Sequence, residues 1–252
     1  AESFGLAAIE ARCDGGEVDL VNEVILDPTF VSNERLKCVY DKFKNGNNTI
    51  SNYLENFLGE TPVAHLQIKA DDDFGINNPD YVTAGAITSQ PINYLIKITF
   101  NTDSSLNSSA ENFPTIILAL ELIHEMVHAE MYRKLLSYAQ QPNIPWTEEF
   151  IHSIRNDFVG LSDYYTRWWL DLPPNSPPTS PQHQAMAQHY IGIMVDAIKE
   201  FDNSQHTTEF YTALTWIGLK NTVAWNDLTP TEQQTINNLI SNAIQDETHD
   251  CN

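Results

Sequence analysis

Residues 115–139 read TIILALELIHEMVHAEMYRKLLSYA, and this stretch decides the fold. It contains neither glycine nor proline, and Pro114 stands directly before it, where the first turn of a helix tolerates proline. Apolar residues recur at helical spacing on both sides of its centre. Arg133 and Lys134 lie toward the end, where positive charge suits the helix dipole. We therefore predict one long, largely buried helix over these residues.

The centre of the predicted helix carries His-Glu-Met-Val-His at residues 124–128. His124 and His128 project from one face, one turn apart, so both can reach a single metal ion. Glu125 lies roughly 100° around the helix from His124, close enough to hold a water bound to that metal. Burying these polar groups among apolar neighbours is costly unless they are paired or bind a cation. The pattern therefore favours a zinc site with two ligands and a general base over two ordinary histidines.

The composition is that of a folded, acidic, globular protein. The chain has 252 residues, of which 42% are hydrophobic and 10% aromatic, enough for one large domain or two small ones. Lys and Arg number 13 against 34 Asp and Glu, which gives a formal net charge of −21. Such a field repels nucleic acids and anionic membranes, so we expect neither as a partner. No apolar run reaches the ~18–20 residues that span a bilayer, so we expect no membrane span.

The start of the chain and its cysteines bear on processing. The chain begins without Met and without a signal peptide, which we interpret as a processed form or a fragment of a larger protein. Three cysteines are an odd number and do not form a disulfide framework. We expect Cys38 to be a buried core residue. Cys13 and Cys251, near the two termini, would pair only if the protein is secreted.

The remaining patterns predict an α+β fold that is mostly helical. Residues 1–28 are acidic and contain Gly15-Gly16, and we expect them to be a leader or a loosely packed segment. Alternating apolar residues predict strands over 66–70 and 94–100, and a weaker strand over 81–88. These strands would form a small antiparallel or mixed sheet beside the long helix. Further helices are predicted over residues 33–44, 49–58, 147–156, 162–170, 182–201, 207–219 and 229–245, with a proline-rich loop at 172–181.

Residues 29–252 are expected to form a single catalytic domain. Within it, residues 29–140 would hold the sheet and the metal-binding helix, and residues 141–252 would form a helical subdomain. A catalytic zinc needs a third protein ligand and an open position for water. We expect the helical subdomain to supply that ligand.

Helix geometry ranks the candidates for the third ligand. In the predicted helix 182–201, His183 falls near the centre of the buried stripe, in the first turn, and His189 falls near its edge. We therefore predict His183 as the ligand and His189 as a donor to the developing oxyanion of a tetrahedral intermediate, or as a group behind the ligands. An ordinary helix-start histidine at His183 stays an alternative, as does ligation by His189, His152 or an acidic residue.

The segment from Leu122 to Glu130 resembles the His-Glu-x-x-His helix of the zincin metallopeptidases. The segment from Gln182 to Tyr190 is similar to the third-ligand segment of SprT-like and zincin-like domains in bacterial secreted and toxin-like proteins. The resemblance covers roughly residues 30–245, and only the first motif is specific. Three family features have no counterpart: the closely following metzincin histidine, the thermolysin-like third glutamate, and the cysteine-rich zinc ribbon of some SprT relatives.

This resemblance implies a secreted or extracellular metalloendopeptidase. Zn²⁺ would be held by the two histidines of the motif and a later residue, with Glu125 as general base, and the partner would be a protein or peptide substrate. We expect an extended substrate to add as a strand beside residues 96–100, interpreted as the sheet edge. Two alternatives remain: a metal-binding helical module or toxin-like effector domain without peptidase activity, and a helical interaction domain with an accidental motif.

Overall fold

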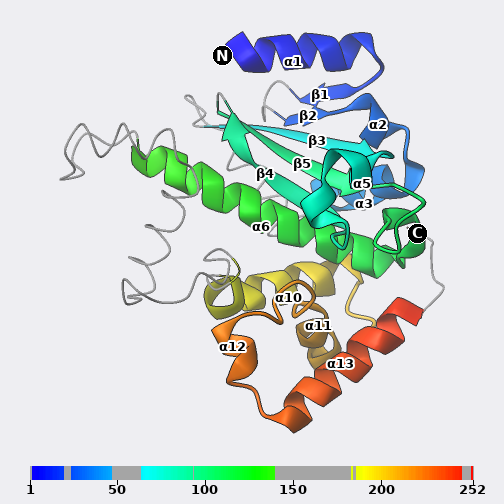
Figure 1. The fold of residues 1–252 in the computed structure, drawn as a ribbon, viewed down its shortest axis with the longest axis vertical. Helices are drawn as coiled ribbons and strands as arrows, with labels where there is room; N and C mark the ends of the chain where they lie inside the picture. The colour runs from blue at the N-terminus through cyan, green and yellow to red at the C-terminus, as the bar shows by residue number, and fades with distance from the viewer. Residues whose placement is uncertain are drawn as a thin grey trace.

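The computed structural model describes residues 2–19, 24–46, 64–92, 94–139, 183, 186–245 and 251. Over these residues the protein is α+β, as predicted: a mixed sheet lies along one side of a long helix, and a group of helices covers the other side (Figure 1). None of the helices in the described parts of the chain has the length and apolarity needed to cross a membrane.

The sheet places two antiparallel strands at the edges of a parallel centre. Its spatial order is β1 (Glu17–Asp19), β2 (Val24–Leu26), β3 (His65–Asp71), β5 (Leu95–Asn101) and β4 (Ala86–Ile92). β2, β3 and β5 run parallel, whereas β1 and β4 pair antiparallel with their neighbours. The register sets Leu66 opposite Ile96 and Ile68 opposite Ile98, and all four side chains are fully buried. The centre of the core therefore lies between β3 and β5.

The expectation that residues 96–100 form the sheet edge is wrong. β5 is paired with β3 on one side and with β4 on the other, so its backbone groups are already used. The weakly predicted strand over 81–88 lies further along the chain, as β4, because a short 3₁₀ helix η1 occupies Pro79–Tyr81. β4 is thus the edge strand on the side of the long helix (Figure 1).

Residues 2–19 and 24–28, the described part of the N-terminal segment, are not loosely packed, contrary to expectation. They form α1 (Glu2–Cys13), β1 and β2, and α1 covers the β1–β2 end of the sheet (Figure 1). Phe4 and Ala8 pack against Ile25, which is fully buried. Gly16 allows the close turn between helix and strand, since a Cβ there would lie 2.5 Å from the carbonyl oxygen of Leu26.

The long helix is α6, and it spans the predicted range, Thr115–Ala139. It contacts β4 and β5 on one side, and α3 (Glu34–Asn45) and α10 (Ile191–Phe201) on others. Apolar side chains on several faces are therefore buried, among them Leu118, Ile123 and Val127. A helix covered on several sides is apolar around most of its circumference, as this one is.

The helices after the long helix match the prediction in part. The predicted helix 182–201 begins with helical His183, continues as a π-helical segment η3 (Met186–Tyr190) and ends as α10. The predicted helix 207–219 stops at Leu214 as α11 (Thr208–Leu214). The predicted C-terminal helix is α13 (Pro230–Gln245). The shorter helices are α2 (Pro28–Val31), α5 (Phe74–Asn77), η2 (Ala110–Asn112) and α12 (Val223–Asn226). The elements predicted over 49–58, 147–156, 162–170 and 172–181 lie outside the described residues.

A disulfide joins Cys38 of α3 to Cys251 near the end of the chain. Cys13 is exposed and free. The expectation that Cys38 is a buried core thiol is therefore wrong. The pairing of Cys13 with Cys251, which the sequence left open, is not the one that forms. The pairing depends on how the C-terminal helices fold back toward α3, which sequence spacing does not encode.

Candidate metal centre

Three histidines from two separate segments meet beside α6. His124 and His128 come from successive turns of α6, and His183 is a helical residue that precedes η3. Their potential ligand atoms all lie within 4.8 Å of one another. The Nε2 atoms of His128 and His183 are 3.2 Å apart. Within the described parts of the chain, no other group of three or more His, Cys, Asp or Glu converges in this way.

The three imidazoles fit a catalytic zinc ion. Burial lowers the pKa of His124 well below its ordinary value, and the neighbouring His128 and His183 lower it further. Burial also lowers the pKa of His183. Neutral imidazole is the form that binds a metal, because one ring nitrogen then has a free lone pair. A set of three histidines also leaves the fourth tetrahedral position for water, as catalytic zinc requires.

Glu125 is the buried carboxyl next to the cluster, and the sheet edge holds it. Its exposed fraction is 4%, and the Oγ1 of Thr88 in β4 lies 2.6 Å from its Oε2 and 3.0 Å from its backbone carbonyl oxygen. A hydroxyl has one proton to donate. The Thr88 hydroxyl therefore donates to one of these two oxygens at a time, and it holds Glu125 against β4.

The surroundings of Glu125 favour its protonated form. Burial raises its pKa to about 8, the carboxyl of Glu121 raises it further, and hydrogen bonds with Thr88 oppose the shift. A carboxyl that titrates near neutral pH can both accept and return a proton under physiological conditions. The geometry thus gives the centre a group suited to acid–base work.

Gly218 lies next to the histidine cluster, in the segment between α11 and α12. The sequence patterns did not indicate that this residue belongs to the site. It lies after α11 with φ +80°, and a Cβ on it would stand 3.0 Å from Cε1 of His124. The backbone at Gly218 therefore comes too close to the His124 ring to leave room for a side chain. A glycine near the end of the predicted helix 207–219 was the available signal, but the proximity of Gly218 to His124 spans 94 residues of sequence.

Of the predicted site residues, His189 is the one that the structure does not bring to the cluster. It lies in η3 with an exposed side chain, whereas His183 lies against the two histidines of the motif. The π-helical turns change the angular spacing of side chains, so an α-helical wheel misplaces them. His152 and the acidic alternatives at Glu148, Glu149 and Asp163 lie outside the described residues.

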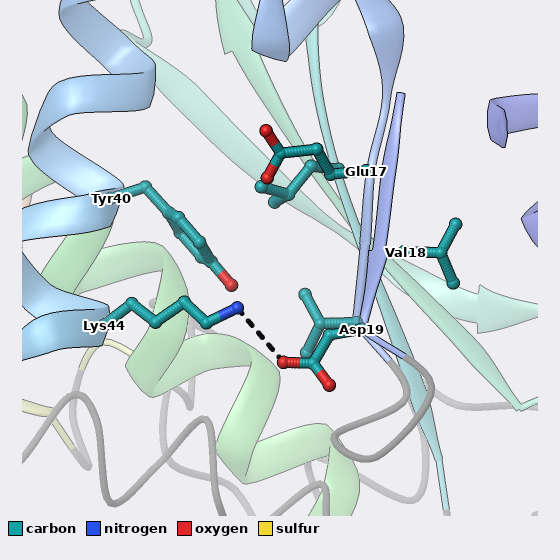
Figure 2. A pocket seen from close by; sticks show the side chains of 7 residues that line it. Glu17, Val18, Asp19, Tyr40 and Lys44 are labelled. Carbon is teal, nitrogen blue, oxygen red and sulfur yellow. Dashed lines mark hydrogen bonds and ion pairs between the residues drawn. The ribbon is translucent and has the colours of Figure 1, made fainter. Parts of the chain in front are cut away.

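A separate hollow of about 300 Å³ lies between α3 and β1 (Figure 2). Tyr40 and Lys44 project from α3 toward β1, and the Nζ of Lys44 lies 3.1 Å from Oδ2 of Asp19. None of the described residues that line the hollow belongs to the histidine cluster. The hollow is thus a feature of the α3–β1 packing, distinct from the metal centre.

No family model matches the sequence, and neither a curated protein nor a solved structure is found to match it. The functional argument therefore depends on the geometry of the site.

Proposed function

We propose that the protein is a zinc-dependent metalloendopeptidase. The observation that carries the proposal is the convergence of His183, from a distant segment, with His124 and His128, while a buried carboxyl stands beside them on the same helix. Three imidazoles and an adjacent glutamate are the residues that metal-assisted hydrolysis requires. Ordinary packing gives no reason to bury His124 and Glu125 beside two further histidines.

Each residue of the centre has a defined task in this proposal. The three histidines would hold Zn²⁺, which when bound polarises the substrate carbonyl and lowers the pKa of a coordinated water. Glu125 would serve as the proton acceptor in such a site and would supply the proton that the leaving amine needs. Thr88 fixes the carboxyl of Glu125 against β4 throughout. Gly218 holds the plane of His124 from the opposite direction.

An extended peptide would bind along β4. This strand ends the described sheet on the side of α6, and its Thr88 contacts Glu125 directly. A substrate that adds a strand there places its backbone carbonyl groups beside the histidine cluster. β4 therefore replaces the 96–100 strand as the expected site of substrate addition.

The proposed setting is extracellular, with protein or peptide as the substrate. The Cys38–Cys251 disulfide supports this setting, because disulfides persist in oxidising compartments. The net charge of −21 disfavours nucleic acid as a partner.

The decisive experiment combines zinc analysis with cleavage of an unstructured protein. We expect the zinc-loaded wild type to cleave it, and E125Q to retain zinc but to lose at least ~10³-fold in kcat/KM, since the general base is removed. Bound zinc without cleavage in the wild type would instead identify a structural metal that joins α6 to the segment of His183. Full activity in E125Q would contradict the role assigned to Glu125.

A further inference from the structure

Glu121 is a second carboxyl on α6, one turn before Glu125, and it has no partner among the described residues. Burial raises its pKa to about 7. Among the described residues no hydrogen bond or ion pair reaches its carboxylate, and it is only partly exposed. Glu130 on the same helix differs, because it forms two hydrogen bonds with Arg133. A largely desolvated carboxyl without a cation is costly to ionise, so this position gains most from a cationic ligand.

The carboxyl of Glu121 lies beside the start of β4, the edge strand along which the substrate is proposed to bind. A Cβ built on Gly85, the residue before β4, would stand 3.1 Å from Cδ of Glu121 and 3.1 Å from the ring of Phe113. Three residues later along the same edge, Thr88 contacts Glu125. β4 and α6 thus run in the same direction here, with Glu121 beside the beginning of the strand and Glu125 beside its middle.

We propose that Glu121 is the specificity residue that binds a basic side chain of the substrate, just C-terminal to the cleaved bond. The inference depends on the proposed peptidase function. Antiparallel addition, the more stable pairing, makes a substrate on β4 run opposite to it. The residues after the cleaved bond then pass Glu121. One helical turn is about 5–6 Å along the axis and one strand residue about 3.3 Å, so the first two such residues come within reach.

The carboxylate of Glu121 favours Lys or Arg at the first two substrate positions after the cleaved bond. A long basic side chain can extend its apolar stem past Phe113 and Gly85 and bring its charge to the carboxylate of Glu121. In a partly desolvated site such a pair is stronger than on the surface, because solvent screens it less. The net charge of −21 also concentrates cationic peptides around the molecule.

The test compares peptides that differ only at the first two positions after the cleaved bond, with Lys or Arg replaced by Met. We expect the zinc-loaded wild type to cleave the basic peptides with about 10- to 100-fold higher kcat/KM. E121Q should reduce this ratio to below about threefold, with unchanged zinc content. The ratio is taken within one protein, so any effect of the substitution on Glu125 cancels from it. E121D should keep part of the preference. E200Q removes one exposed carboxylate from α10, and the preference should persist in it.

Each other outcome has one meaning. A wild type that cleaves the basic and Met peptides equally well overturns the inference and leaves the peptidase proposal intact, and this comparison does not depend on any variant folding. A preference that survives in E121Q, or that disappears in E200Q, also overturns the role of Glu121. A zinc-loaded wild type that cleaves none of the peptides overturns the proposed function itself.

Discussion

Gly218 has the least room for change among the residues of the metal centre. A Cβ on it would stand 3.0 Å from the ring of His124, and its φ of +80° lies where L side chains are strained. We expect G218A to displace the imidazole and to weaken zinc binding about tenfold or more, measured by competition with a chelator. G192A is the matched control, because a Cβ on Gly192 meets nothing within 4 Å. Equal zinc affinity in the two variants would contradict the positioning role.

Some residues of the candidate site can be found from a short sequence pattern, and others only from the folded structure. The spacing of His124, Glu125 and His128 is contained in one helical turn, so sequence reading could relate them. His183 could be predicted because it falls on the buried side, at the start of a later predicted helix. Thr88 and Gly218 carry no pattern of their own, since each gains its role by touching α6 from a segment far away in the sequence. Long-range packing, and not local propensity, determines them.

The helices and strands also differ in whether a local sequence pattern or long-range packing determines them. α6 was predictable because 25 residues without glycine or proline have no alternative of comparable stability. β1 and β2 were missed because each has only three residues, too few to show the period of two. The position of β5 inside the sheet was missed because strand order depends on crossover connections, which alternation does not reveal.

The N-terminus of α13 supplies a prediction at the scale of one element. Thr229 and Glu232 form a reciprocal capping box: Oγ1 of Thr229 accepts from the backbone N–H of Glu232, and the Glu232 carboxylate accepts from the backbone N–H of Thr229. We expect T229A to lower the free energy of unfolding by about 1 kcal/mol in urea titrations. Zinc content should stay unchanged, because α13 supplies none of the three histidines. A variant as stable as the wild type would exclude this role.

At the scale of the whole molecule, the Cys38–Cys251 disulfide closes a loop of 213 residues. A crosslink over such a distance restricts the unfolded chain strongly, so we expect C38S to lose about 2–5 kcal/mol of stability. The measurement is denaturant unfolding without reductant, with C13S as the control, since Cys13 is free and exposed. Equal stability of C38S and C13S would show that the disulfide does not hold the fold.

The buried carboxyls give the metal-free protein a characteristic pH dependence. The pKa values of Glu121 and Glu125 are raised by burial to about 7 and about 8, so the folded state binds more protons than the unfolded state above pH 4.5. The lowered pKa values of His124 and His183 act in the opposite direction, mainly below about pH 6.5. Between about pH 6.5 and 8 stability should therefore fall as pH rises, by on the order of 1 kcal/mol.

Thermal unfolding of the chelated protein across this pH window checks the carboxyl effect. The double variant E121Q/E125Q should show a flatter profile than the wild type, because neither amide titrates. The same slope in both proteins would assign the pH dependence to other groups.

X-ray absorption at the zinc edge of the purified, zinc-loaded protein tests the central claim most directly, because it reports the ligands themselves. The account predicts one zinc per chain with three imidazole nitrogens at about 2.0–2.1 Å and one oxygen, and loss of one imidazole in H183A. A protein that binds no zinc, or a spectrum that H183A leaves unchanged, would contradict it.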